Sequence, residues 1–307
     1  MIFFTALEVV LIMLLYCVPG FIIVKSKKLP EESISHLSKL LLYCFQPFLM
    51  LSLLYGMDNS PKALKNMGIF ALAALAVMGF FLLCVFLIFR KKLKGDITYR
   101  IYTISCVLCN SSFMGVPILN AVIPNKGVVV YSAIFSVIMN LLAWTVITAI
   151  ISCDTSYISV KKIFLNPTMI SLAIALPIFL FGVKFPASIE NMISLMGKMT
   201  TPLSMMIIGM RLATVNPREQ FLDIRKYGIV FIKMILFPLF WVALSYLFPL
   251  PTEVKNTMLV ICCCPTASIT LNFAELLGKG QKTAANLVLL STILSLATLP
   301  LMLFLFM

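Results

Sequence analysis

The chain has 307 residues, of which 61% are hydrophobic and only 11% charged, and its mean hydropathy is +1.07. A water-soluble domain carries about a quarter charged residues, so this composition excludes a soluble fold and indicates a protein embedded in a lipid bilayer. The formal net charge of +13 does not indicate a nucleic-acid partner, because the cations cluster in short loops beside apolar runs, where they face the cytoplasm and anionic lipid.

Ten apolar segments follow one another along the chain, separated by short polar connections. A hydrocarbon core about 30 Å thick requires about 20 apolar residues per helix, and these segments are of that order. The first lacks the basic stretch of a secretory signal and is long enough to span. We therefore predict an all-α integral membrane protein with ten transmembrane helices, at residues 3–24, 34–56, 66–89, 99–123, 127–151, 163–182, 188–210, 227–248, 254–277 and 282–305.

Lysine and arginine are concentrated in every second connection. The connections after the odd-numbered segments hold most of them, including Lys25, Lys27 and Lys28 after the first segment and Arg90 and Lys91 after the third. By the positive-inside rule, these connections face the cytoplasm. We therefore expect a multi-pass protein of the plasma or inner membrane with both termini outside.

The ten segments divide into two halves of five, residues 1–151 and 152–307. Because five is an odd number, the second half would insert upside down relative to the first, as in inverted-repeat transporters. Faint similarities in the same order indicate a duplication: VPGFIIVKSKKLP (18–30) with LPIFLFGVKFP (176–186), the stretches after Pro47 and Pro202, and NAVIPNKG (120–127) with FAELLGKG (273–280).

The fourth and ninth segments carry helix-breaking and polar residues in corresponding positions of the two halves. Proline removes a backbone hydrogen bond and glycine adds flexibility, and the freed backbone groups are tolerated in a membrane only where they line a protein cavity. Such residues also occur where membrane helices merely pack closely or kink. The paired placement favours a substrate site at the bilayer midplane, formed by Asn110, Ser111, Ser112, Gly115, Pro117, Pro265, Thr266, Ser268, Thr270 and Asn272.

Four further polar residues lie inside the predicted spans. Lys198 is near mid-depth if its helix begins where predicted, and an ammonium group there would face a cavity or a partner; if the helix begins later, Lys198 reaches the outer interface. Lys233 either reaches the cytoplasmic interface or contributes a charge to coupling. Glu8 is a candidate proton-coupling carboxylate, and Asn140 either bonds neighbouring helices or lies near the site.

Six segments carry longer motifs. CNSSFMGVPIL (109–119) and CPTASITLNFAELLG (264–278) lie in the broken segments, and STILSLATLPLM (291–302) follows; the others are MNLLAWTVI (139–147), PLSMMIIGMRL (202–212) and IKMILFPLFW (232–241). In combination these motifs resemble the auxin efflux carrier family, whose members include plant auxin exporters and bacterial malate or malonate permeases. The resemblance covers essentially the whole chain.

This resemblance implies a ten-helix fold related to the bile-acid sodium symporters, in which helices four and nine cross. It also implies a homodimer, a scaffold of helices 1, 2, 6 and 7, and a transport domain of helices 3–5 and 8–10 that moves like an elevator. By position, Asn110 matches the family's asparagine at the crossover, which contacts the substrate carboxylate, and Pro265 matches the ninth-helix crossover proline. Cys109 departs from the pattern, since plant members have a proline there, and their long cytoplasmic loop is absent.

We therefore predict a secondary transporter for small organic carboxylate anions such as malate or related mono- and dicarboxylates. We expect no enzyme, because motifs such as HExxH and GxSxG are absent. We expect no cofactor or metal, because the cysteines, including Cys106 and Cys109, lie mostly in apolar runs; coupling to protons or sodium stays open. Two alternatives also stay open: an efflux carrier for auxin-like aromatic carboxylates, and a membrane sensor that binds a ligand without moving it.

Overall fold

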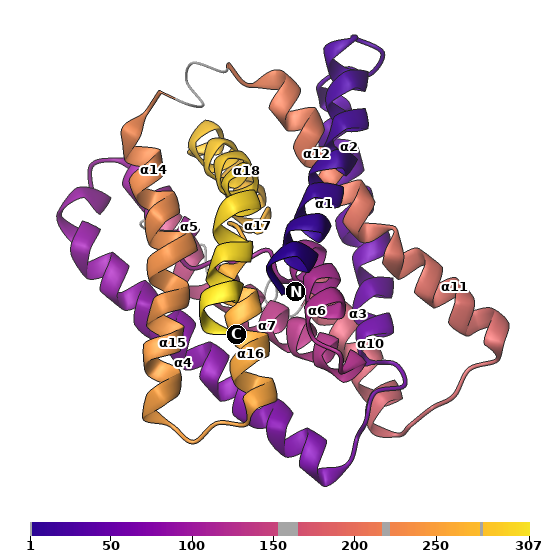
Figure 1. Cartoon of the computed structure of the whole chain (residues 1–307). Coiled ribbons are helices and arrows are strands. Elements are labelled where there is room, and N and C mark those ends of the chain that lie inside the picture. The colour runs from indigo at the N-terminus through magenta and orange to yellow at the C-terminus, as the bar shows by residue number, and fades with distance from the viewer. Residues whose placement is uncertain (1, 153–164, 217–221, 277–278) are drawn as a thin grey trace.

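The part of the chain that the structure describes is built from helices. The computed structural model describes residues 2–152, 165–216, 222–276 and 279–307, and Figure 1 shows their arrangement. The helices are α1 (Ile2–Lys25), α2 (Glu32–Leu40), α3 (Gln46–Leu54), α4 (Pro61–Leu93), α5 (Ile97–Ser105), α6 (Val116–Val122), α7 (Val129–Leu142), α8 (Thr148–Ser152), α10 (Pro167–Leu180), α11 (Ala187–Lys198), α12 (Thr200–Thr214), α14 (Ile224–Phe231), α15 (Phe237–Leu247), α16 (Thr252–Cys263), α17 (Ile269–Leu276) and α18 (Gln281–Phe306).

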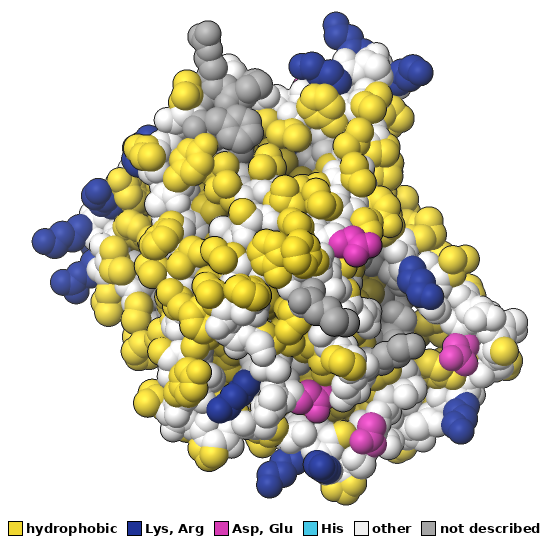
Figure 2. All heavy atoms as spheres, in the orientation of Figure 1, with side chains coloured by type: hydrophobic (Ala, Val, Ile, Leu, Met, Phe, Trp, Pro, Cys, Tyr) yellow, Lys and Arg dark blue, Asp and Glu magenta, His cyan; other side chains and the backbone are white. Residues whose placement is uncertain are grey.

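Six helical stretches within the described ranges are long and apolar enough to cross a membrane: Ile2–Lys25, Glu32–Leu54, Pro61–Leu93, Val129–Ser152, Ile224–Leu247 and Gln281–Phe306. Their outer faces carry large apolar side chains; Leu72 and Ile88, for example, are 71% and 69% exposed. Figure 2 shows apolar side chains spread over one face of the molecule, with most Lys and Arg side chains toward its margins. So extensive an apolar surface requires a lipid solvent. The predicted all-α membrane fold is confirmed.

In the part of the chain that the structure describes, four π-helical turns widen the helices, at Leu41–Phe45, Ser111–Gly115, Ala143–Ile147 and Ile232–Leu236. Three of them are followed by a proline two residues later, at Pro47, Pro117 and Pro238. A proline has no N–H to donate to the carbonyl four residues before it, so the preceding turn loses its regular hydrogen bond and takes the wider π form. Turns of this kind often occur at functional sites.

One predicted span is divided. The segment 188–210 consists of two helices, α11 and α12, that meet at Met199, so the expectation of one continuous helix there is wrong. Pro202 supplies no N–H to the carbonyl of Lys198, and the Thr200 hydroxyl donates to the carbonyl of Gly197 at 2.6 Å. Both effects favour an interruption at this point. The arrangement as ten spans in two inverted repeats stays a prediction.

Helices α1 and α12, one from each half of the chain, pack along each other more extensively than any other described pair. Their backbones touch. A Cβ atom added to Gly20 would lie 2.0 Å from the carbonyl oxygen of Met206, and one added to Gly209 would lie 1.9 Å from that of Cys17. Small residues permit this approach in membrane helices, where packing contacts replace the hydrophobic effect. Helix α3 packs in turn against α10 and α11.

The predicted fourth and ninth spans are interrupted where their polar residues cluster, and the two interruptions meet. Helix α5 ends at Ser105 and α16 at Cys263. Between these helices and their continuations, the backbone N–H of Asn110 donates to the carbonyl of Pro265 at 2.8 Å, and the N–H of Ala267 donates to that of Leu108 at 3.0 Å. These bonds form a short antiparallel bridge. Each broken helix thus satisfies backbone groups that the other leaves free.

Side chains complete the crossing. The hydroxyl of Thr266 donates to the carbonyl of Ser105 at 3.2 Å, and the N–H of Thr266 donates to the Ser291 hydroxyl on α18 at 3.1 Å. All three residues are at most 1% exposed. A buried backbone N–H without a partner is costly, so Ser291 ties the crossing to α18.

We expect the substitution Gly209→Ala to destabilise the folded protein by about 1–3 kcal/mol, because the added methyl group forces two touching backbones apart. The matched control is Gly79→Ala in α4, where nothing lies within 4 Å of an added Cβ atom and the change should be neutral or slightly stabilising. Thermal unfolding in detergent measures both. Equal melting temperatures for the two variants would contradict the close packing of α1 and α12.

We expect Ser291→Ala to lower stability by about 1–3 kcal/mol, because the buried N–H of Thr266 loses its acceptor. Ser295→Ala is the control on the same helix, since that hydroxyl is equally buried but donates only to the carbonyl of Thr292 within α18. The free energy of unfolding, measured by denaturant titration in mixed micelles, should fall clearly more for the first variant. The reverse order would argue against an anchoring role for Ser291.

Candidate functional site

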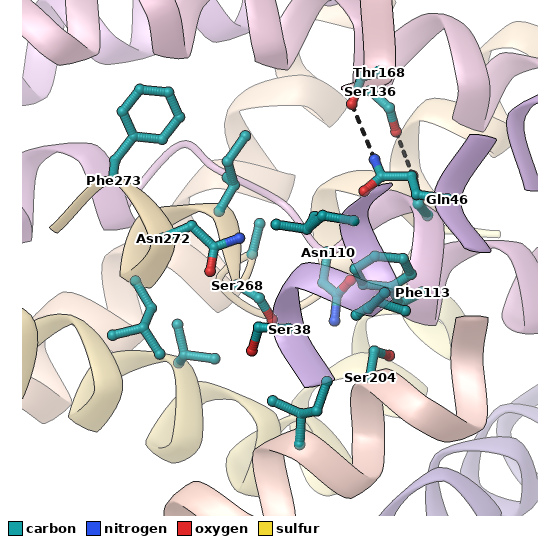
Figure 3. Close-up of a pocket in the computed structure, with 18 of the residues that line it drawn as sticks. Ser38, Gln46, Asn110, Phe113, Ser136, Thr168, Ser204, Ser268, Asn272 and Phe273 are labelled. Atoms are coloured by element: carbon teal, nitrogen blue, oxygen red, sulfur yellow. Dashed lines mark hydrogen bonds between the residues drawn. The ribbon is translucent and has the colours of Figure 1, made fainter. Parts of the chain in front are cut away.

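A cavity of about 400 Å³ lies against the crossing of the two broken helices. Side chains from both halves of the chain line it, and Figure 3 shows Gln46, Asn110, Ser268 and Asn272 around it. Ligand sites of small molecules have volumes of about 300–1,000 Å³ and combine an apolar lining with a few placed polar groups. The cavity therefore has the size and character of a binding site for a small molecule.

The structure brings six of the predicted site residues together in the lining of the cavity: Asn110, Ser111, Ser112, Asn140, Ser268 and Asn272. The other five from the broken segments do not line it. Pro265 and Thr266 belong to the backbone bridge, and Pro117 lies in the first turn of helix α6. Gly115 packs against the sulfur of Cys264, and Thr270 is fully buried away from the cavity. These five lie outside the lining, whereas the first six face the space beside the crossing.

Asn110 is the polar residue at the centre of the crossing. Its backbone N–H and carbonyl hold the bridge to Pro265 and the first turn after the break. Its side chain is only 3% exposed, and its amide nitrogen Nδ2 makes no hydrogen bond with any described residue. A buried donor without a partner costs roughly 1–3 kcal/mol. Because the side chain lines the cavity, a bound ligand can supply the missing acceptor.

A chain of serine hydroxyls connects the broken helix to α7. The hydroxyl of Ser136 donates to the carbonyl of Ser132, so it accepts from its other two hydroxyl neighbours, Ser111 at 3.0 Å and Ser112 at 2.6 Å. The hydroxyl of Ser132 donates to the carbonyl of Ser111 at 2.7 Å. The amide of Asn140 donates to the carbonyl of Ser136 one turn further along. This network fixes the polar wall of the cavity.

The helices that resume after the two breaks begin at the cavity. The π-helical turn Ser111–Gly115 leads into α6, and α17 begins at Ile269; Ser111, Ser112, Ser268 and Ile269 all line the cavity. The first N–H groups of a helix have no partner within it, and the helix dipole places a partial positive charge there. Two such ends therefore face the same space, which favours an anion.

Two cationic side chains line the cavity as well, Lys39 and Arg211. Arg211 is half-buried in the last turn of α12, and Lys39 is exposed near the end of α2. The sequence did not assign either residue to the site. Arg211 follows the predicted span 188–210 as a loop cation, and Lys39 lies in the second predicted span, away from the two broken ones. A lysine inside an apolar segment was the available signal for Lys39. Together they add positive charge to a cavity that two helix N-termini already make favourable for anions.

Other lining residues were not foreseen from the sequence. Gln46 at the start of α3 donates through its amide nitrogen Nε2 to the hydroxyl of Thr168 on α10 at 3.0 Å, and both residues line the cavity. The signal available for Gln46 was an amide placed before Pro47 in an apolar run. Aromatic rings also contribute: Trp144 and Phe273 meet edge to face, with ring centroids 4.8 Å apart. The lining is therefore mostly apolar, with polar groups at a few positions.

The three charged candidates lie elsewhere. Glu8 and Lys198 are exposed on α1 and at the end of α11, and neither lines the cavity. Lys233 is 0% exposed, so the interpretation that it reaches the cytoplasmic interface is wrong. Its ammonium group Nζ donates to the carbonyl of Cys262 at 3.0 Å and lies 3.2 Å from the sulfur of Cys109 and 4.8 Å from the ring centre of Phe237. The widened turn in which it lies directs it into the crossing.

Lys233 has an electrostatic role that its position makes clear. Its acceptor, the carbonyl of Cys262, belongs to the last turn of α16. Carbonyl groups at a helix C-terminus lack partners and carry partial negative charge, so a cation there is stabilising.

Among the described residues, no three His, Cys, Asp or Glu side chains are grouped as metal ligands.

Comparison with known proteins identifies the chain's family. A family model described as membrane transport protein matches residues 2–303, nearly the whole length. A search of curated proteins finds no match. The long apolar helices of the described ranges fit a protein of this kind. The chain is a multi-pass membrane protein that belongs to the auxin efflux carrier family of membrane transport proteins.

Proposed function

We propose that the protein is a secondary transporter that carries small organic carboxylate anions, such as malate or related mono- and dicarboxylates, by alternating access. The observation that carries the proposal is the side chain of Asn110, which lines a cavity between two helix N-termini and whose amide donor is buried without a partner among the described residues. A carboxylate supplies strong acceptors to such donors. Lys39 and Arg211 give the same cavity a favourable potential for an anion on its way in.

The cavity also suits a moving carrier. Asn110, Ser268 and Asn272 belong to the broken helices, which the family resemblance assigns to the transport domain. Ser38, Gln46 and Ser204 belong to helices α2, α3 and α12 of the expected scaffold, and they line the same cavity. A substrate between the two groups is released when one group slides past the other. We propose this elevator-type movement, together with a homodimer and both termini outside, as the working arrangement.

A second substrate class has an observation in its favour. Phe113, Trp144 and Phe273 line the cavity, and aromatic side chains pair favourably with a ring in edge-to-face or offset geometry. An auxin-like aromatic carboxylate would place its ring against them and its carboxylate at Asn110. Malate and indole-3-acetate, used as competitors in one assay, separate the two classes.

We expect Asn110→Ala to reduce uptake of labelled malate into proteoliposomes, measured by counterflow, by about tenfold or more, because the substrate loses a buried hydrogen bond to its charge. Asn120→Ala is the control, since Asn120 is exposed on α6 of the same broken helix and lies outside the cavity. Competition by a panel of carboxylates and indole-3-acetate then ranks the substrates.

Other outcomes of this assay have clear meanings. Equal uptake by the Asn110→Ala variant and the unsubstituted protein would refute the site. Saturable binding of a carboxylate without flux would identify a membrane sensor in place of a carrier. Neither binding nor flux for any carboxylate would refute the proposed substrate class.

We expect Arg211→Gln to raise the apparent KM for the transported anion about tenfold and to weaken its dependence on ionic strength, because the cavity loses a positive charge. Lys184→Gln removes an exposed cation that does not line the cavity and should leave KM unchanged. Initial rates of uptake at several salt concentrations measure both effects. A KM that does not change in Arg211→Gln would show that Arg211 takes no part in attracting the substrate.

A further inference from the structure

The side chain of Gln46 has one satisfied end and one end without a partner. Its nitrogen Nε2 donates to the Thr168 hydroxyl, while its oxygen Oε1 makes no hydrogen bond with any described residue. Gln46 is 8% exposed and lines the cavity. Figure 3 shows the amide nitrogen directed at Thr168 and the oxygen directed away from it, on the side of the cavity. A polar atom is thus held buried at the cavity wall with nothing to bond.

The position of this amide is fixed by the two helices that carry it. Gln46 is the first residue of α3, directly after the π-helical turn Leu41–Phe45, and Thr168 lies in the first turn of α10. Helices α3 and α10 pack closely, so the amide has little freedom to find a partner elsewhere. An unpartnered buried amide is costly. A ligand that bonds it recovers this free energy, whereas a ligand that only covers it does not.

We propose that Gln46 is a specificity-determining residue, which forms a hydrogen bond with a hydroxyl group that the substrate carries in addition to its carboxylate. This inference rests on the proposed carboxylate transport. A threonine hydroxyl can accept from Nε2 or donate to Oε1, so either end of the amide can face the cavity. A substrate hydroxyl fits both cases, because it donates to Oε1 and accepts from Nε2.

The two contacts lie on different parts of the fold. Asn110, which would hold the carboxylate, belongs to a broken helix, and Gln46, which would hold the hydroxyl, belongs to α3 of the expected scaffold. A hydroxy acid would therefore form hydrogen bonds with both the broken helix and α3. The matching acid without a hydroxyl would form them with the broken helix only. The second acid would bind more weakly, because the amide of Gln46 stays unpaired, as it is in the empty site, and its free energy is not recovered.

The test compares two pairs of acids that differ by one hydroxyl, malate with succinate and lactate with propionate. Each acid competes with the labelled substrate in proteoliposomes containing the unsubstituted protein or Gln46→Met, which keeps the length of the side chain without its amide. We expect the unsubstituted protein to prefer the hydroxy acid about tenfold. In Gln46→Met this preference should disappear, chiefly through weaker binding of the hydroxy acid.

Two further variants separate hydrogen bonding from packing. Leu49→Met changes a buried apolar residue of the same helix α3 that does not line the cavity and should keep the preference, since the swap conserves volume. Thr168→Val keeps the side chain of Gln46 but removes the hydroxyl that orients its amide. The preference for the hydroxy acid should therefore fall in part. If Gln46→Met does not yield folded protein, Thr168→Val carries the test.

The outcomes distinguish this inference from the proposal on which it rests. Transport of both acids of a pair without preference, or a preference that persists in Gln46→Met and Thr168→Val, overturns the role of Gln46 and leaves the carboxylate carrier standing. Failure of all four acids to compete for any transported anion refutes small-carboxylate transport, and the inference falls with it.

Discussion

The structure depends on one requirement, that two interrupted helices leave no backbone group unsatisfied in an apolar surrounding. In lipid, free N–H and C=O groups cost several kcal/mol each, and a break in a single helix would be prohibitive. The bridge between Asn110 and Pro265 and between Leu108 and Ala267 solves this by pairing one break with the other. The interruption then costs little, and its remaining groups become available to a ligand.

The same arrangement separates charge. The helices that resume after the breaks present their N-termini to the cavity, while a carbonyl at the C-terminal end of α16 accepts from Lys233, which does not line the cavity. A positive potential therefore develops where an anion would bind, and the corresponding negative end is neutralised by a residue of the chain itself. With the contact to Phe237, this explains how an ammonium group with 0% exposure is accommodated.

The sequence predicted the features that follow from local backbone chemistry. Proline, glycine and asparagine act on the chain where they occur, so the breaks near Asn110 and Pro265 and six lining residues could be found without a structure. Gln46 and Arg211 were missed because each reaches the cavity through helix packing between distant segments. Of the two alternatives for Lys233, the cytoplasmic interface is wrong for a related reason: the sequence does not show which way a π-helical turn directs the side chain.

The contact between α1 and α12 carries a consequence for how the molecule can move. Where helices meet through side chains, rotamers can rearrange and the pair can slide from one packing to another. At Gly20 and Gly209 the neighbours of each glycine are backbone atoms of the other helix, which have no alternative rotamers. A shift by one residue would bring a side chain against a carbonyl group. Helices α1 and α12 therefore keep one register. Any movement that opens the cavity has to come from the other helices that line it.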